Sequence, residues 1–195
     1  IIHNGIPENL YVSPKNLNHQ PIIGFLIADS KDIVKGFNLF LLLLKKQMDR
    51  YRFLLAGNYE SDKLPIHHNI KMFGYINSEK QLQSFFKEID ILVYTSIYDN
   101  FPNVILESLA QSTPVIAFDV CGIAEIIRDK TNGFLVEPFN LDKFRQKIEE
   151  VLDNNYLYKQ LSISAFDTSR SQFSISKVSN TLVNIYRDKV MLLNQ

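Results

Sequence analysis

The sequence has no tryptophan, a single cysteine, only seven glycines in 195 residues and no net charge. The lone Cys121 excludes an internal disulfide and a cysteine-based zinc site, and it is typical of a reducing compartment. Because 21 basic residues balance 21 acidic ones, we expect no nucleic-acid partner. The longest wholly apolar run, Leu39 to Leu44, is far shorter than the roughly 18 residues of a membrane-spanning helix. These features favour a cytoplasmic protein.

Short apolar runs alternate with amphipathic segments along the chain. Hydrophobic residues make up 46% of the sequence and charged residues 22%, as in ordinary globular proteins. This alternation predicts an α/β, Rossmann-like domain with a mostly parallel sheet of about six strands flanked by helices. The expected strands are 22–28, 51–56, 70–73, 89–94, 115–118 and a short strand ending at 136. The expected helices are 35–46, 78–87, one from 103, one capped by Asn140, and two near 156–166 and 173–191.

The chain begins with Ile rather than Met, and no charged-then-apolar leader opens it. We therefore expect a segment of a longer protein without a signal peptide. Residues 1–21 are polar, contain three prolines and show no periodicity, which is typical of a linker. We divide the chain into a linking segment (1–21), a Rossmann-like domain (22–170) and a C-terminal helix (171–195).

Two carboxylates lie on either side of the expected start of the helix at Asn103, one before it and one after it. Asp99 lies in the loop before it, and Glu107 lies one turn into it. Helix N-termini expose unpaired N–H groups that bind anions, and Asn103 is a suitable cap after Pro102. A phosphate at this position would have a hydrogen-bond acceptor on either side, suited to sugar hydroxyls. An ordinary strand-loop-helix crossover with solvated acids explains the bare pattern equally well.

The same stretch resembles a known family. Asp99 and Glu107 stand in S-x-x-D-N-F-P-N-V-x-L-E-S-L-A-x-x-x-P-V-I-A, which is similar to the E-x7-E segment of the retaining GT-B glycosyltransferases of family 4. Asp99 replaces the first Glu of that pattern. The pair Lys35-Gly36 resembles the family's K-G pair, and Gly74-Tyr75 resembles its F-x-G-Y turn. The opening N-G-I is similar to the family's N-G-V-D crossing between domains.

The resemblance implies that this segment is the C-terminal, donor-binding half of a GT-B enzyme, whose missing N-terminal domain would bind the acceptor. The donor would be a UDP- or GDP-sugar, with no metal or other cofactor. Lys35, Asp99 and Glu107 are the expected catalytic residues. The diphosphate would be held by Lys35 and the N–H groups of Asn103 and Val104, and the ribose by Glu107.

Further expected contacts complete the donor site. Asp99 and the backbone at Phe101 and Pro102 would border the hexose. The base would lie beside three residues after the third strand, namely Gly74, Tyr75 and Ile76, although packing between domains is an equal alternative for Tyr75. The resemblance points to bacterial surface polysaccharide or glycolipid synthesis by a hexosyltransferase. We expect the segment alone to be inactive, and any membrane association at the inner face to occur through the missing domain.

The sequence departs from the family pattern near the first strand. Gly24-Phe25-Leu26 stands where the family commonly has an Arg in G-R-L, and Lys31 is one conceivable substitute. This departure and Asp99 leave open a non-catalytic GT-B binding or assembly module. An epimerase or a phosphorylase of the same fold is a further alternative.

Three other features attract attention, and we interpret each as structural. Neighbouring histidines in a loop, His67 and His68, rarely converge on one metal ion. Glu88-Ile89-Asp90 has the look of a metal-binding D-x-D motif but precedes a buried strand. Cys121 is expected to be a small packing residue, and His3 a structural or solvated one.

Overall fold

The computed structural model describes the backbone of residues 4–193 and side chains as far as residue 188. His3 lies outside the described residues. The sheet has six strands in the order β3-β2-β1-β4-β5-β6, and every pair is parallel. The strands are β1 (Ile22–Asp29), β2 (Arg52–Asn58), β3 (Ile70–Gly74), β4 (Ile91–Tyr94), β5 (Val115–Phe118) and β6 (Gly133–Val136). The expected α/β, Rossmann-like fold is confirmed.

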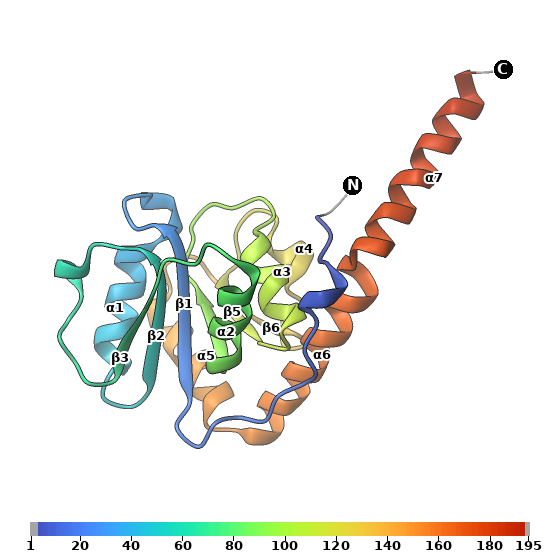
Figure 1. Ribbon diagram of the computed structural model, residues 1–195. Coiled ribbons are helices and arrows are strands. Elements are labelled where there is room, and N and C mark those ends of the chain that lie inside the picture. The colour runs from blue at the N-terminus through green and yellow to red at the C-terminus, as the bar shows by residue number, and fades with distance from the viewer. Residues whose placement is uncertain (1–3, 194–195) are drawn as a thin grey trace.

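Helices connect the strands and cover both faces of the sheet, as Figure 1 shows. They are α1 (Phe37–Gln47), α2 (Glu79–Glu88), α3 (Asn103–Ala110), α4 (Ile123–Ile126), α5 (Leu141–Leu152), α6 (Asn155–Phe173) and α7 (Ile175–Leu193). Short 3-10 turns are η1 (Glu8–Leu10), η2 (Ile33–Lys35) and η3 (Ser61–Lys63). Helix α7 extends away from the sheet in Figure 1, and Val183 and Tyr186 on it are exposed.

The core consists of two apolar clusters, one on each face of the sheet. Successive residues of β2 alternate between them, because side chains of a strand point to opposite faces. Phe53 and Leu55 pack with α1 and α5, whereas Leu54 and Ala56 pack with α2 and α3. A parallel sheet covered on both faces explains why its strands read as continuous apolar runs in the sequence.

Several boundaries differ from the sequence-based expectation. Helix α1 begins at Phe37 rather than residue 35, because Gly36 adopts a left-handed φ of 70° that ends η2. Strand β4 begins at Ile91 rather than residue 89, and the side chain of Asp90 is committed to hydrogen bonds with the N–H groups of Asn18 and Ile22. The interpretation of Asp90 as a structural residue agrees with this geometry.

The expectation for Cys121 is wrong. The residue is exposed and has a φ of 46°. It forms a turn with Gly122, where a Cβ atom would stand 1.7 Å from the carbonyl oxygen of Asn100. The turn thus lies tightly against the loop of Asn100, and the Cys121 side chain is on its exposed side rather than in the core.

The N-terminal segment lies against the domain from Asn4 onward. Ile6 pairs with the junction of α6 and α7 through hydrogen bonds with the backbone of Phe173 and Ile175. Lys15 is partly buried, and its ammonium donates to the carbonyls of Phe86 and Ile89. Burial lowers the pKa of Lys15 to about 8, and nearby Asp90 counteracts that shift. The linking segment is therefore fixed to the C-terminal end of α2.

Within residues 4–193, no helix is long and apolar enough to cross a membrane.

Candidate functional site

The strand order reverses between β1 and β4, and open α/β sheets bind ligands beyond the carboxyl ends of the strands at such a point. Two cavities lie there, side by side, and share the end of β1 as a common wall. One has a volume of about 320 Å³ and the other about 360 Å³. The shared wall is formed by Leu26, Ile27 and Ala28.

The first cavity brings together residues from η2, β4 and the start of α3. It contains six of the residues that the sequence predicts for the site, namely Lys35, Asp99, Phe101, Pro102, Asn103 and Val104. Tyr94, which the sequence analysis missed, lines it as well. A tyrosine at the carboxyl end of a buried strand, five residues before an acidic loop residue, is the signal that could have identified it.

Lys35 reaches the cavity from the last position of η2. Asp32 begins this turn, since its carboxylate accepts a hydrogen bond from the N–H of Val34 at 3.2 Å. Gly36 then reverses the backbone before α1, and the Lys35 ammonium lies 2.7 Å from Oδ2 of Asp99. The side chains of Lys35 and Asp99 are 32% and 16% exposed. The lysine predicted to bind diphosphate is thus already paired with the acid predicted to border the hexose.

Tyr94 donates its hydroxyl proton to the same Oδ2 atom of Asp99 at 2.5 Å. Burial raises the pKa of Tyr94 well above its ordinary value, and the hydrogen bond to Asp99 raises it further. The phenol therefore stays protonated and can act as a donor throughout the physiological pH range. Asp99 accepts from one charged and one neutral donor.

Helix α3 directs its N-terminus into this cavity. The prediction that Asn103 caps the helix is wrong, because Pro102 occupies the cap position and Asn103 is the first helical residue. Oδ1 of Asn103 instead accepts a hydrogen bond from the side-chain amide of Asn4 at 2.8 Å. In the described part of the chain, no side chain caps α3, so the N–H groups of Asn103 and Val104 remain available to an anion, whereas that of Ile105 donates to the carbonyl of Pro102 at 3.1 Å.

The loop before α3 packs against the end of α6. The ring of Phe101 packs edge-on against Phe173 at the end of α6, with 5.9 Å between ring centroids. Pro102 has no N–H and shapes the wall of the cavity without donating to it. The loop is therefore anchored to the helix that ends where α7 begins.

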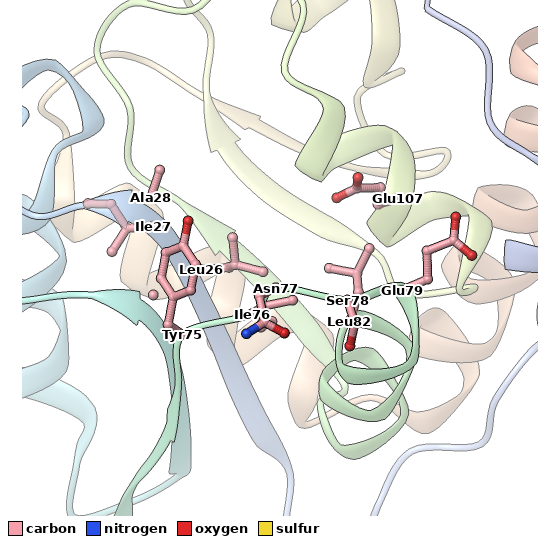
Figure 2. Close-up of a pocket in the computed structure, with 11 residues that line it drawn as sticks. Leu26, Ile27, Ala28, Tyr75, Ile76, Asn77, Ser78, Glu79, Leu82 and Glu107 are labelled. Atoms are coloured by element: carbon pink, nitrogen blue, oxygen red, sulfur yellow. The ribbon is translucent and has the colours of Figure 1, made fainter.

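Three residues that the sequence predicts for the site line the second cavity. Glu107 lies on one side of it, and Tyr75 and Ile76 lie on the other (Figure 2). Burial raises the pKa of the Glu107 carboxyl. Asn77, Ser78 and Glu79 at the start of α2 also line it, and the sequence analysis did not include them. Ser78 accepts from the N–H of Gln81 at 3.3 Å and so caps α2.

Gly74 does not line either cavity. It ends β3 with a φ of 91°, and a Cβ atom there would meet nothing within 4 Å. Gly57 lines the second cavity instead, and a Cβ atom on it would stand 1.6 Å from the carbonyl oxygen of Ile27. Close packing of β1 and β2 thus requires glycine at residue 57, whereas only the backbone angle favours it at residue 74.

Other candidate groups lie elsewhere. Lys31, considered as a substitute for the missing arginine, lines neither cavity and is exposed. His67 and His68 have ring centroids 4.4 Å apart, and Nε2 of His67 lies 3.2 Å from Oδ1 of Asp49. Among the described residues, no group of three or more His, Cys, Asp or Glu side chains could hold a metal ion.

Two curated glycosyltransferases illustrate the sequence similarity. The chain is 26% identical over 210 residues to an uncharacterized glycosyltransferase of Methanocaldococcus jannaschii, covering 96% of this chain and 53% of that protein. It is 26% identical over 162 residues to the lipopolysaccharide core biosynthesis glycosyltransferase LpsE of Rhizobium meliloti, covering 80% of this chain and 47% of that protein. The chain thus spans about half the length of these relatives.

Solved structures share the fold. Anabaena HepE in complex with UDP has a TM-score of 0.81 at 19% identity, covering 96% of this chain and 57% of that one. The C-terminal domain of a glycosyl transferase group 1 family protein from Francisella tularensis has a TM-score of 0.72 at 20% identity, covering 88% of this chain and 100% of that one. The family itself is established by sequence, since residues 14–167 match it. The chain belongs to the family of glycosyl transferases group 1.

Proposed function

We propose that this chain is the donor-binding, C-terminal half of a retaining GT-B hexosyltransferase that uses a UDP- or GDP-sugar without a metal ion. The observation that carries the proposal is the meeting of Lys35 with the uncapped start of α3 in one cavity. An ammonium and free backbone N–H groups together suit a diphosphate. The adjoining cavity with Glu107 suits the nucleoside.

The similar proteins support the proposal in two ways. The HepE structure contains UDP, and the matching Francisella structure is itself a C-terminal domain. LpsE acts in lipopolysaccharide core biosynthesis, which supports a role in bacterial surface polysaccharide or glycolipid synthesis. The acceptor site would belong to a partner domain that precedes this segment, and any membrane contact would be made there.

The proposed reaction breaks the bond between the anomeric carbon and the diphosphate oxygen, and the electron pair leaves with the nucleoside diphosphate. An acceptor hydroxyl forms the new bond on the same face of the sugar, and its proton passes to the departing diphosphate oxygen. Lys35 and the start of α3 stabilise the negative charge that builds on the leaving oxygen. Glu107 would accept hydrogen bonds from the ribose, and Asp99 from the hexose.

Binding of nucleotides to the 195-residue chain tests this proposal. We expect UDP or GDP, but not inorganic phosphate, to raise the melting temperature without added metal. A ligand at about 100 times its Kd stabilises by about 2.7 kcal/mol, which corresponds to roughly 5–10 °C for a domain of this size. A rise with phosphate alone would favour a phosphorylase. No rise with any nucleotide would contradict the proposal and favour a binding or assembly module.

A lysine substitution locates the site. Charged hydrogen bonds contribute about 1.5–3 kcal/mol, so Lys35→Ala should weaken binding of the nucleoside diphosphate by roughly tenfold or more. Lys45→Ala is a matched control, because Lys45 is an exposed lysine of α1, the helix that follows η2, and lines neither cavity. Equal affinities of the two variants would refute the assignment of the diphosphate site.

A further inference from the structure

We propose that Tyr94 is a positioning residue for recognition of the donor sugar. Its hydroxyl holds one oxygen of Asp99 and so presents the other oxygen to the hexose. This inference rests on the proposed function, since it concerns the sugar that the first cavity would hold. Tyr94 lies outside the D-N-F-P-N loop and the K-G pair, so the inference adds a residue to the donor site.

The position of Tyr94 gives it the rigidity that such a role needs. It is the last residue of β4, is 6% exposed and packs in the apolar cluster against α2 and α3. A phenol has only two rotatable side-chain bonds, so a buried ring places its hydroxyl at little cost in entropy. The 2.5 Å hydrogen bond to Oδ2 of Asp99 therefore fixes a loop residue to the end of a central strand.

Lys35 alone could not fix Asp99 while it also binds a diphosphate. Its ammonium lies 2.7 Å from the same Oδ2 atom and is the more exposed partner of the pair. An arriving diphosphate would attract this ammonium and weaken its hold on Asp99. The neutral phenol is not drawn to phosphate in this way, so it keeps the carboxylate in place.

The arrangement also leaves one oxygen of Asp99 for a ligand. Within residues 4–193, both partners of its carboxylate bind Oδ2. Oδ1 is thus available to accept a proton from a sugar hydroxyl in the first cavity, which Asp99 lines. Asp is one methylene shorter than Glu, and the phenol of Tyr94 fixes this short side chain where it borders the cavity. We infer that Tyr94 and Asp99 act as a pair.

Isothermal titration of the 195-residue chain and its variants tests the inference. The probes are UDP, GDP, UDP-glucose, UDP-N-acetylglucosamine and GDP-mannose. Tyr94→Phe keeps the buried ring and removes only the hydroxyl. We expect it to weaken the best-bound nucleotide sugar by about tenfold and the matching nucleoside diphosphate by less than about twofold. A purely structural role would change both affinities together.

Two further variants complete the test. Tyr98→Phe is the control, because Tyr98 lies in the loop of Asp99, is 58% exposed and lines neither cavity. We expect this variant to leave all affinities unchanged. Adding Asp99→Glu to Tyr94→Phe should recover most of the lost sugar affinity, since a longer carboxylate needs no phenol to fix it. Equal losses for sugar nucleotide and diphosphate, no loss with any probe, or no recovery would overturn the inference. Absence of nucleotide binding by the unmodified chain would instead overturn the proposed function, and this inference with it.

Discussion

A Cβ atom on Gly36 would stand 1.9 Å from the carbonyl oxygen of Thr95, so the backbones of these two residues lie in direct contact. Oγ1 of Thr95 donates a hydrogen bond to the carbonyl of Gly36 at 2.9 Å, which fixes the contact. The two segments follow β1 and β4, the strands at which the sheet order reverses. This close approach is what brings Lys35 within 2.7 Å of Asp99.

Gly36→Ala should therefore unfold more easily and lose the placement of Lys35. The new methyl group would clash with Thr95, and a φ of 70° is unfavourable for alanine. We expect a loss of about 2–4 kcal/mol in the free energy of unfolding, measured in urea. Gly74→Ala is the matched control, because Gly74 also has a positive φ but open space around it, and should cost only about 1 kcal/mol. Similar losses for both variants would contradict the role of the Thr95 contact.

Lys15 is the second residue whose loss should destabilise the chain. Its ammonium donates at 2.8 Å to Phe86, 2.9 Å to Ile89 and 2.6 Å to Oγ1 of Thr113. Lys15→Met would leave these acceptors without their donor and should cost about 2 kcal/mol or more in urea unfolding. Lys80→Met, an exposed lysine on α2, should change the free energy by less than about 0.5 kcal/mol. No difference between the two would show that the contacts of the Lys15 ammonium add nothing to stability.

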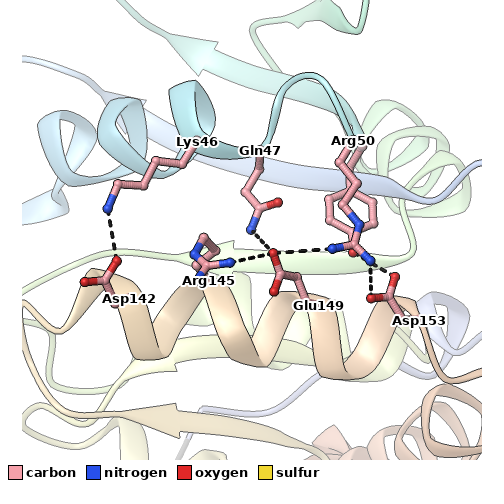
Figure 3. Close-up of polar contacts among 8 residues, drawn as sticks. Lys46, Gln47, Arg50, Asp142, Arg145, Glu149 and Asp153 are labelled. Carbon is pink, nitrogen blue, oxygen red and sulfur yellow. Dashed lines mark hydrogen bonds and ion pairs between the residues drawn. The ribbon is translucent and has the colours of Figure 1, made fainter.

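A polar network joins α1 to α5, and Glu149 lies at its centre (Figure 3). One oxygen of Glu149 accepts from Gln47 at 3.2 Å and from Arg145 at 2.8 Å, and lies 3.5 Å from Nη1 of Arg50. Glu149→Ala should lower the free energy of unfolding by about 1 kcal/mol, because several partners share this acceptor. Since salt screens exposed charges, the loss should shrink at high ionic strength.

Glu150→Ala is the control for this network. Among the residues that the structure describes, Glu150 pairs with Lys147 alone and its side chain is 46% exposed, so we expect a change of less than about 0.5 kcal/mol. If this variant lost as much stability as Glu149→Ala, the network would have no special contribution.

The meeting of Lys35 with α3 was predictable, since the carboxyl ends of parallel strands share one edge of the sheet. The strand over residues 115–118 was predictable because a short, continuous apolar run between turn residues is typical of a strand in a parallel sheet that is covered on both faces. Both inferences depend only on pattern and topology. They hold even where the predicted ends of helices and strands are wrong by one or two residues.

The contacts between side chains were not predictable. Asn103 was expected to cap α3, but Asn4, which lies 99 residues away in the sequence, occupies its side-chain oxygen. The sharing of Asp99 by Lys35 and Tyr94 depends on the pairing of β1 with β4 and on the left-handed turn at Gly36. Such contacts follow from the packed backbone. A local pattern can single out Tyr94 as a candidate, but it does not specify which atoms the side chain contacts.

Glu107 should show opposite effects on binding and on stability. Its carboxyl lines the second cavity, and burial raises its pKa from an ordinary value of 4.5. A raised pKa in the folded state means that ionisation opposes folding. The stabilising contribution of the protonated form is complete below pH 4.5 and is lost as the pH rises through the folded-state pKa.

Glu107→Gln cannot ionise, so it should melt at a higher temperature than the unmodified chain at pH 7. This advantage should disappear below pH 4.5, where both proteins carry an uncharged group. Thermal melts from pH 4 to pH 8 measure the difference. Glu79→Gln, at the start of α2 and on the rim of the same cavity, is the control for removal of one negative charge from this cavity.

The same substitution should weaken nucleotide binding by about tenfold, because under the proposed function it replaces a charged acceptor of ribose hydroxyls by a neutral one. Comparison of a ribonucleoside diphosphate with its 2′-deoxy and 3′-deoxy forms isolates this contact. The unmodified chain should prefer the ribose form, and Glu107→Gln should lose most of that preference while it remains the more stable protein at pH 7. If the preference persisted in the variant, another residue would have to recognise the ribose.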